Sequence, residues 1–184
     1  MTITFHPNGR IEGINNDNFK LSMPAGTIIQ VVESSYSGEN TITDTSTPQQ
    51  IFSGSITPKF SSSRIRVELL IFSYHQNYHD GFVGIFKDSS STALQGTGSG
   101  GKTNASFMVR QGSYENQSND YQNNPGVFSF LDTAGTTSAI TYNVKGYTSN
   151  SGYPLYVNRT QSRSQNDSNM PKYRSALTLT EILV

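Results

Sequence analysis

The segment Arg64-Ile-Arg-Val-Glu-Leu-Leu-Ile-Phe72 carries the clearest secondary-structure signal of the chain. Apolar residues at odd positions from 65 to 71 alternate with charged residues at positions 64, 66 and 68. This period of two is the pattern of a β-strand with one buried face. Leu70 and Phe72 then make the second half apolar on both faces. The segment therefore predicts a strand that becomes covered on both sides, as in a β-sandwich or at a subunit interface.

Shorter apolar segments recur along the chain, each bounded by clusters of Gly, Pro, Asn or Ser. The seven prolines fall between these segments or at their edges, where a missing backbone N–H is tolerated. No long stretch keeps a helical period. We therefore predict an all-β fold, an antiparallel β-sandwich with little or no helix, which the resemblance described below makes jelly-roll-like. The predicted strands lie near residues 27–35, 49–56, 64–74, 82–87, 105–110, 126–132, 139–148, 154–158 and 175–183.

The composition limits the classes of partner. The chain has 184 residues, enough for one domain, with 13 Lys and Arg against 13 Asp and Glu and a formal net charge of zero. General electrostatic binding of nucleic acid or of an anionic membrane needs an excess of positive charge, so neither partner is expected. The absence of cysteine excludes disulfides and thiolate sites. The apolar run Leu69-Leu-Ile-Phe72 is too short for membrane insertion.

Residues 1–25 differ from the domain that we place at residues 26–184. They are rich in Asn and contain isolated apolar side chains. Two interpretations stay open, an arm that docks on another protein and an ordinary edge strand with loose ends. If the segment is an attachment arm, the candidate docking residues are Phe5, Ile11, Ile14 and Phe19.

One motif resembles a nucleotide site. Gly96-Thr-Gly-Ser-Gly-Gly-Lys-Thr103 fits the phosphate-binding loop formula of Gly, four residues, Gly, Lys and Thr. A functional loop of this kind needs a helix that begins at the Lys-Thr pair. Residues 104–110 are instead short and strand-like. We interpret the motif as an exposed hairpin loop and expect no bound nucleotide or other cofactor.

Metal binding and catalysis are also disfavoured. His75 and His79 have the four-residue spacing of helical metal ligands, but they lie where a strand runs into a turn. A symmetry axis could gather three copies of one histidine, yet a polar surface is the simpler interpretation. The chain lacks cysteine and the Gly-X-Ser-X-Gly motif, and no carboxylate pair has a setting that suggests tuned acidities. We predict that the protein is not an enzyme and holds no metal.

The ten tyrosines, with no tryptophan beside them, are the residues best suited to recognition. A tyrosine ring offers a flat apolar face to a sugar or protein and a hydroxyl for hydrogen bonding. Structural packing is the competing role for each of them. The candidate receptor contacts lie in polar segments and are Tyr78, His79, Tyr114 and Tyr121.

Several pieces of the chain, read in order, resemble a small β-sandwich module of tailed-bacteriophage virion proteins that is related to trimeric jelly rolls. The matches extend over residues 23–183, and the loops do not match. The pieces are Met23-Pro-Ala-Gly-Thr-Ile-Ile-Gln-Val-Val32, Ser55-Ile-Thr-Pro58 with Ser61-Ser-Ser-Arg-Ile-Arg-Val67, Thr141-Tyr-Asn-Val-Lys145, Leu155-Tyr-Val-Asn-Arg159 and Ser175-Ala-Leu-Thr-Leu-Thr-Glu-Ile182.

The resemblance implies a non-enzymatic, homotrimeric structural protein of a phage. The first expectation is a short tail-fibre or fibre-tip component, made in the host cytoplasm and located on the tail of the virion. Few residues precede the module, so residues 1–25 would provide the whole attachment to other virion proteins. The loops would then contact a glycan or protein of the host surface. The alternative is a capsid decoration protein, a cement or head-fibre protein that binds only other virion subunits.

Overall fold

The computed structural model describes residues 4–5, 11–12, 23–75, 80–95, 105–109, 124–160 and 173–184. Within these residues all regular secondary structure is β-strand, and no helix is present. The strands are β1 (Thr4–Phe5), β2 (Ile11–Glu12), β3 (Ile28–Tyr36), β4 (Asn40–Ile42), β5 (Gln49–Ile56), β6 (Arg64–His75), β7 (Gly81–Lys87), β8 (Phe107–Val109), β9 (Asn124–Thr133), β10 (Ile140–Thr148), β11 (Leu155–Val157) and β12 (Ser175–Ile182).

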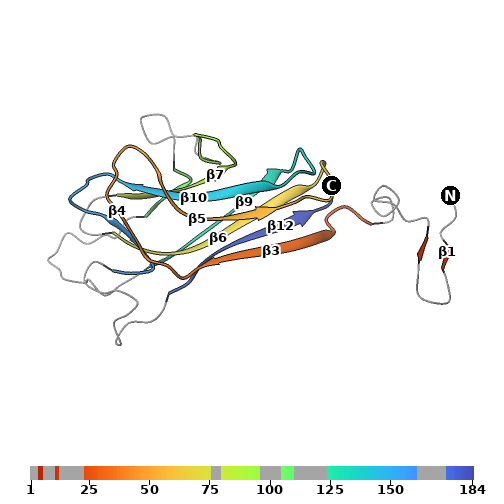
Figure 1. The fold of residues 1–184 in the computed structure, drawn as a ribbon, viewed down its shortest axis with the longest axis horizontal. Helices are drawn as coiled ribbons and strands as arrows, with labels where there is room; N and C mark the ends of the chain where they lie inside the picture. The colour runs from red at the N-terminus through yellow and green to blue at the C-terminus, as the bar shows by residue number, and fades with distance from the viewer. Residues whose placement is uncertain are drawn as a thin grey trace.

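Ten of these strands form two antiparallel sheets that pack against each other (Figure 1). Over its main part the first sheet has the order β3-β12-β6-β9, with β11 and β4 extending it beyond β12, and the second sheet has the order β5-β10-β7-β8. The pairs β3 with β12, β5 with β10, β6 with β9 and β7 with β8 are nested hairpins in chain order. This is the strand arrangement of a jelly roll. The predicted antiparallel, jelly-roll-like sandwich is confirmed.

The antiparallel pairing gives the sandwich two different ends. We call the end where β3 begins and β12 finishes the base end, and the opposite end the loop end. The short connections 57–63 and 134–139 lie at the base end. At the loop end β6 finishes and β7 begins, and β8 finishes and β9 begins. In Figure 1 the C-terminus marks the base end, and the β1–β2 hairpin lies beyond it.

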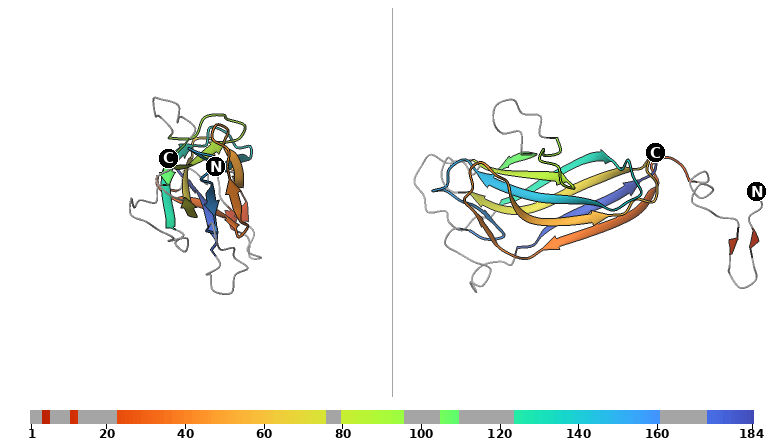
Figure 2. Two further views of the ribbon diagram at one scale, coloured as in Figure 1. Left: turned by 90° about the vertical axis from the view of Figure 1, so that its left-hand side faces the viewer. Right: turned by 45° about the horizontal axis from the view of Figure 1, so that its top comes forward.

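The core lies between the two sheets, which Figure 2 shows stacked face to face. Alternate residues of β6 point into it, so the pattern read from the sequence is also the pattern of burial. Along the β3 and β5 edges the core is closed by the stacked rings of Tyr36 and Phe52, whose centroids are 5.4 Å apart. Gly54 permits this close approach, because a Cβ there would lie 2.7 Å from the Ser34 hydroxyl. The largest fully buried residues of the sheets include Ile65, Leu69, Ile71, Ile85, Phe86, Tyr142, Leu177 and Leu179.

All nine predicted strand regions contain a strand. The structure adds β4, which forms by pairing with β11. Its three residues Asn-Thr-Ile are too few to show an alternating pattern. It also adds the two-residue pair β1 and β2. β11 continues the row of β12 along β6, because Val157 pairs with Ser73 just beyond the last β12 pair at Leu70. One long strand, β6, thus organises the first sheet along its full length.

Candidate functional site

The predicted receptor contacts belong to connections at the loop end. Tyr78, His79, Tyr114 and Tyr121 themselves lie outside the described residues. The chain around them is placed by the pairing of Gly81 with Val109, which brings the start of β7 beside the finish of β8. Two connections that are far apart in sequence therefore begin and finish at one end of the sandwich.

The predicted attachment residues are divided by the structure. Phe5 and Ile11 are direct partners in the β1–β2 pair, which brings two of the four candidates together. Ile14 and Phe19 lie outside the described residues.

The chain joins the sandwich beside its own C-terminus. The backbone N–H of Gly26 donates to the carbonyl of Leu183 at 2.8 Å, and the N–H of Leu183 donates to the carbonyl of Thr27 at 2.9 Å. Gly26 has a φ of +88°, a left-handed conformation that favours glycine at this turn. The start of the sandwich is therefore fixed at the base end.

A buried carboxylate organises the base end. Glu181 on β12 is fully buried, and its oxygens accept the backbone N–H groups of Lys59 and Phe60 at 2.9–3.1 Å. The side-chain amide of Gln30 donates to it at 2.6 Å. Three donors compensate for the loss of hydration of the carboxylate. Glu181 thus holds the β5–β6 connection against β12 and β3.

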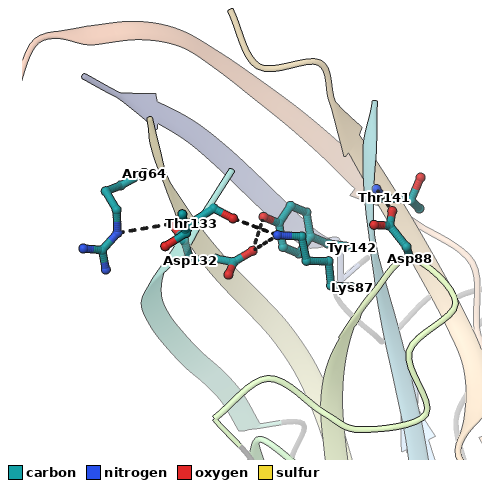
Figure 3. Close-up of polar contacts among 7 residues, drawn as sticks. All are labelled: Arg64, Lys87, Asp88, Asp132, Thr133, Thr141 and Tyr142. Carbon is teal, nitrogen blue, oxygen red and sulfur yellow. Dashed lines mark hydrogen bonds and ion pairs between the residues drawn. The ribbon is translucent and has the colours of Figure 1, made fainter. Parts of the chain in front are cut away.

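A second polar cluster closes the open side of the sandwich near the base end (Figure 3). Lys87 and Tyr142 both point to the carboxylate of Asp132, with the ammonium at 2.9 Å and the hydroxyl at 2.8 Å. Lys87 also donates to the carbonyl of Thr133 at 2.8 Å, and Arg64 donates to the carbonyl of Asp132 at 3.3 Å. The cluster connects β9 of the first sheet with β7 and β10 of the second.

The chemistry of this cluster favours a structural role. Burial raises the pKa of the Tyr142 hydroxyl well above its usual value, and the neighbouring Asp132 raises it further. The phenol therefore stays protonated at neutral pH and serves as a hydrogen-bond donor. Asp132 is in turn neutralised by Lys87. The three side chains satisfy one another between the two sheets.

At the loop end, a buried asparagine bonds to three other segments of the chain. The side-chain amide of Asn158 donates to the carbonyls of Tyr36 and Gly38, both at 2.9 Å, and its oxygen accepts from the Ser175 hydroxyl at 2.7 Å. Its own N–H donates to the carbonyl of Phe72 at 2.9 Å. Asn158 has a φ of +56°, which asparagine tolerates better than most residues. It lies between the segment of β6 that pairs with β11 and the segment of β6 that pairs with β12.

His75 lies deeper in the loop end than a surface histidine would. It is buried, and its Nε2 lies 2.9 Å from the hydroxyl of Thr148, which donates to the carbonyl of Tyr153 at 2.7 Å. The interpretation of His75 as a surface loop residue is therefore wrong, because it occupies an inward-facing position on β6. Its proposed companion His79 lies outside the described residues. Among the residues that are described, no group of three potential metal ligands is found.

The sequence that follows the phosphate-loop motif is not helical. The motif itself lies outside the described residues, but Phe107–Val109 is the strand β8. A helix that began at the Lys-Thr pair and bound a phosphate would continue into these residues, which form a strand instead. Just before β8, Ser106 bridges to the edge of β7, with its N–H on the carbonyl of Val83 and its hydroxyl accepting from the N–H of Ile85.

The two outer faces of the sandwich differ sharply. The outward residues of the second sheet that keep contact with solvent include Ser53, Ser55, Thr141, Asn143 and Lys145, all polar, while its outward aromatic residues Phe82, Phe86 and Tyr147 are buried. The outer face of the first sheet instead carries large apolar side chains that stay exposed on its two outermost strands. These are Ile28 and Val31 on β3, with exposed fractions of 56% and 57%, and Val127 and Leu131 on β9, with 76% and 46%.

None of these four residues was predicted as a site residue from the sequence. Both strands were predicted, but their sequences do not show which side chains face outward. The available signal is that β3 and β9 carry apolar residues at alternating positions of both parities, as β6 does in its second half. Such a strand has more apolar surface than one sandwich interior can bury.

A comparison of the sequence with models of known protein families gives no match, and a comparison with curated proteins also gives none. In the part of the chain that the structure describes, no helix is long and apolar enough to cross a membrane.

Proposed function

We propose that this protein is a non-enzymatic structural component of a tailed-phage virion, a short tail-fibre or fibre-tip protein. It attaches to other virion proteins through residues 1–25 and contacts the host surface at the loop end. The observation that supports this most directly is the polarity of the molecule. The N-terminal segment joins the sandwich at the base end, and the connections that carry the candidate receptor contacts begin and finish at the other end.

The structure of the two ends fits this division of roles. Recognition residues are commonly placed on loops that a rigid scaffold positions. Here Asn158 and His75 anchor the strand ends beneath the loops. A jelly roll alone does not specify a function, because the fold serves many. The placement of the arm and of the loops is what favours an attachment protein.

The pieces that carry the resemblance are also physically linked. Ser55–Pro58 and Ser61–Val67 flank the connection at Lys59 and Phe60, and the last piece contains Glu181, which accepts both of their N–H groups. The Thr-Glu-Ile ending and the turn after Thr-Pro are therefore joined by the hydrogen bonds of Glu181. This supports, independently of strand patterning, the proposal that the pieces belong to one module.

We further propose that the protein forms a homotrimer, as the resemblance implies. The exposed apolar residues of the first sheet supply the surface that such an assembly would bury. Three arms would then emerge together at the base end, and three sets of loops would face away from the particle.

Immunogold labelling of intact phage particles that contain this chain tests the proposal. We expect gold at the tail, with the loop end accessible to an antibody raised against the purified protein. Labelling of the head would replace this proposal with the capsid decoration alternative. Purified particles that carry no label would contradict both. In a parallel assay, incubation with host polysaccharide should release no reducing ends, and their appearance would overturn the non-enzymatic assignment.

A further inference from the structure

The exposed apolar residues of the first sheet form two separate patches. Ile28 and Val31 lie on β3, which is one edge of the sheet, and Val127 and Leu131 lie on β9, which is the opposite edge. Strands in a sheet are about 4.8 Å apart, so three strand spacings place the edges about 14 Å from each other. The patches are thus distinct surfaces and not one continuous apolar face.

Between the patches, the outward residues near the level of Val31 and Leu131 are polar and balanced in charge, while the half-buried Leu70 and Ala176 lie further towards the loop end, level with Val127. The outward side chains of β12 there include Thr178 and Thr180, and those of β6 include Arg66 and Glu68. The Arg66 guanidinium lies 3.9 Å from the Glu68 carboxylate, and both side chains are more than two-fifths exposed. A partner that covered the whole face would have to remove this pair from water, which costs more than such pairs usually return.

The strand registers place the two patches at the same height. Val31 pairs with Thr180, Thr180 pairs with Arg66, and Arg66 pairs with Leu131. Val31 and Leu131 are therefore the two ends of one cross-strand row, perpendicular to the strands. Ile28 and Val127 extend the patches from this row in opposite directions along the strands.

We propose that the β3 edge of one copy of this chain packs against the β9 edge of the next, in a closed ring whose axis runs parallel to the strands. The contact is heterologous, because each copy uses one edge on each side. It brings Val31 of one protomer against Leu131 of its neighbour. The ring stands on the structure alone, and only its size, three, rests on the proposed function.

Two observations identify the occupant of each patch as a second copy. A head-to-tail contact closes into a ring only if it involves no shift along the axis, and otherwise it grows into a filament. The shared row of Val31 and Leu131 meets this condition. In addition, those outward residues of the second sheet that stay exposed in the described part of the chain are polar, and its outward aromatic residues Phe82, Phe86 and Tyr147 are buried. The complementary apolar surface that a copy offers is therefore its other edge. The arrangement also leaves Arg66 and Glu68 hydrated.

A charge-swap experiment tests the contact with the full-length chain. We would prepare Val31→Asp, Leu131→Lys and the double variant, and measure their masses by light scattering at micromolar concentration. Both positions are exposed in the single chain, so the variants should keep the far-ultraviolet circular dichroism of the parent. The matched control is the pair Ser53→Asp and Ser55→Lys on the polar outer face of the second sheet.

We expect the parent and both controls to have three times the chain mass of 20.2 kDa. Each single variant should fall to the monomer mass, because a charge then faces an apolar side chain. The double variant should recover the trimer mass, because the introduced carboxylate and ammonium meet at every contact. A monomeric parent, or a double variant that stays monomeric while folded, would overturn the proposed contact. If the parent is a dimer, the proposed ring is wrong. If the parent is a closed ring of another size, the proposed contact stands and the trimer is wrong. Particle labelling is unaffected by these outcomes, so the proposed function is judged separately.

Discussion

The base end and the loop end of the sandwich hold their backbone connections in place in different ways. At the base end, short connections are held by a charged group, the carboxylate of Glu181, which accepts backbone N–H groups directly. At the loop end, neutral side chains do this work, with Asn158 and Thr148 bonding to backbone carbonyls. The base end therefore depends on donors of the backbone, and the loop end depends on acceptors.

The difference indicates which end tolerates change. A carboxylate with several N–H partners fixes one connection of fixed length, so the base end offers little freedom around Lys59 and Phe60. The anchors of the loop end bond to the first residues beyond the strands, such as Gly38 and Tyr153. We expect the sequence that lies further out to vary more than the connection at Lys59 and Phe60. An attachment protein needs this combination, a constant base and variable loops.

The largest effect is expected from removing the anchor of the base end. Glu181→Ala leaves the N–H groups of Lys59 and Phe60 without their acceptor in a buried site. At about 1–3 kcal/mol for each unsatisfied donor, the free energy of unfolding should fall by about 4 kcal/mol. Urea denaturation followed by circular dichroism measures this loss.

Two controls accompany Glu181→Ala. Glu181→Gln keeps one oxygen acceptor and the shape, and should lose about half as much stability. Gln49→Ala shortens an exposed polar side chain on β5 and should change stability by less than about 0.5 kcal/mol. A loss for Glu181→Ala as small as that for Gln49→Ala would mean that the carboxylate does not organise the base end.

The next largest loss of stability is expected at the loop end. Two variants of Asn158 distinguish the contribution of its side-chain hydrogen bonds from that of its backbone conformation. Asn158→Ala removes the bonds to Tyr36, Gly38 and Ser175 and forces alanine into a φ of +56°. Asn158→Gly removes the same bonds without that backbone strain. We expect losses of about 3 kcal/mol for alanine and about 2 kcal/mol for glycine, the difference being the cost of the left-handed conformation. Equal losses would show that the backbone conformation relaxes.

A smaller effect concerns the cluster that closes the sandwich near the base end. The raised pKa of Tyr142 means that the folded protein holds this proton after the unfolded chain has released it, above about pH 10. Stability from this group is therefore full below pH 10 and decreases as the pH rises further, by up to about 1.4 kcal/mol per pH unit. Tyr142→Phe should lose about 1 kcal/mol at neutral pH, with its bond to Asp132, and should weaken the alkaline decline.

This pH dependence is measured by denaturation between pH 8 and about 11. Burial also raises the pKa values of Tyr36 and Tyr147, so Tyr142→Phe should reduce the alkaline slope without abolishing it. Tyr147→Phe is the comparison, because it removes a hydroxyl whose pKa is raised by burial alone, and it should reduce the slope less than Tyr142→Phe does. An unchanged slope in Tyr142→Phe would show that Tyr142 already ionises in the folded state as it does in the unfolded chain.

The fold was predictable from sequence because its strands follow local rules. β6 alternates in sequence and in burial, and glycine, proline and asparagine mark the turns. The missed strand β4 forms only because β11 lies beside it, which is a tertiary effect. The order of the strands in the two sheets also depends on contacts between distant segments, such as β3 with β12. The sequence suggested the jelly roll through resemblance and not through periodicity.

The interactions that hold the ends were not predictable, for a related reason. Glu181 lies in an alternating strand where a glutamate reads as solvated, and only the folded chain brings Lys59 and Phe60 to it. In the sequence Asn158 cannot be distinguished from the many other asparagines, because no neighbouring residue indicates its left-handed φ. His75 was misread because the strand extends to include it, which turns its side chain inward.

The smallest effect on stability should come from the loops, where the effect on function is expected to be greatest. The four candidate receptor contacts lie in the connections of the loop end, beyond the anchored strand ends. Each alanine variant should therefore change the free energy of unfolding by less than about 0.5 kcal/mol. The variants are Tyr78→Ala, His79→Ala, Tyr114→Ala and Tyr121→Ala. If these residues contact the host, adsorption of phage particles carrying the variants should fall, because aromatic contacts dominate many recognition surfaces. Gln49→Ala on the second sheet is the control for adsorption as well. Unchanged adsorption with all four variants would remove them as receptor contacts, and a loss of stability comparable to that of Asn158→Ala would show that the loops help to hold the loop end together.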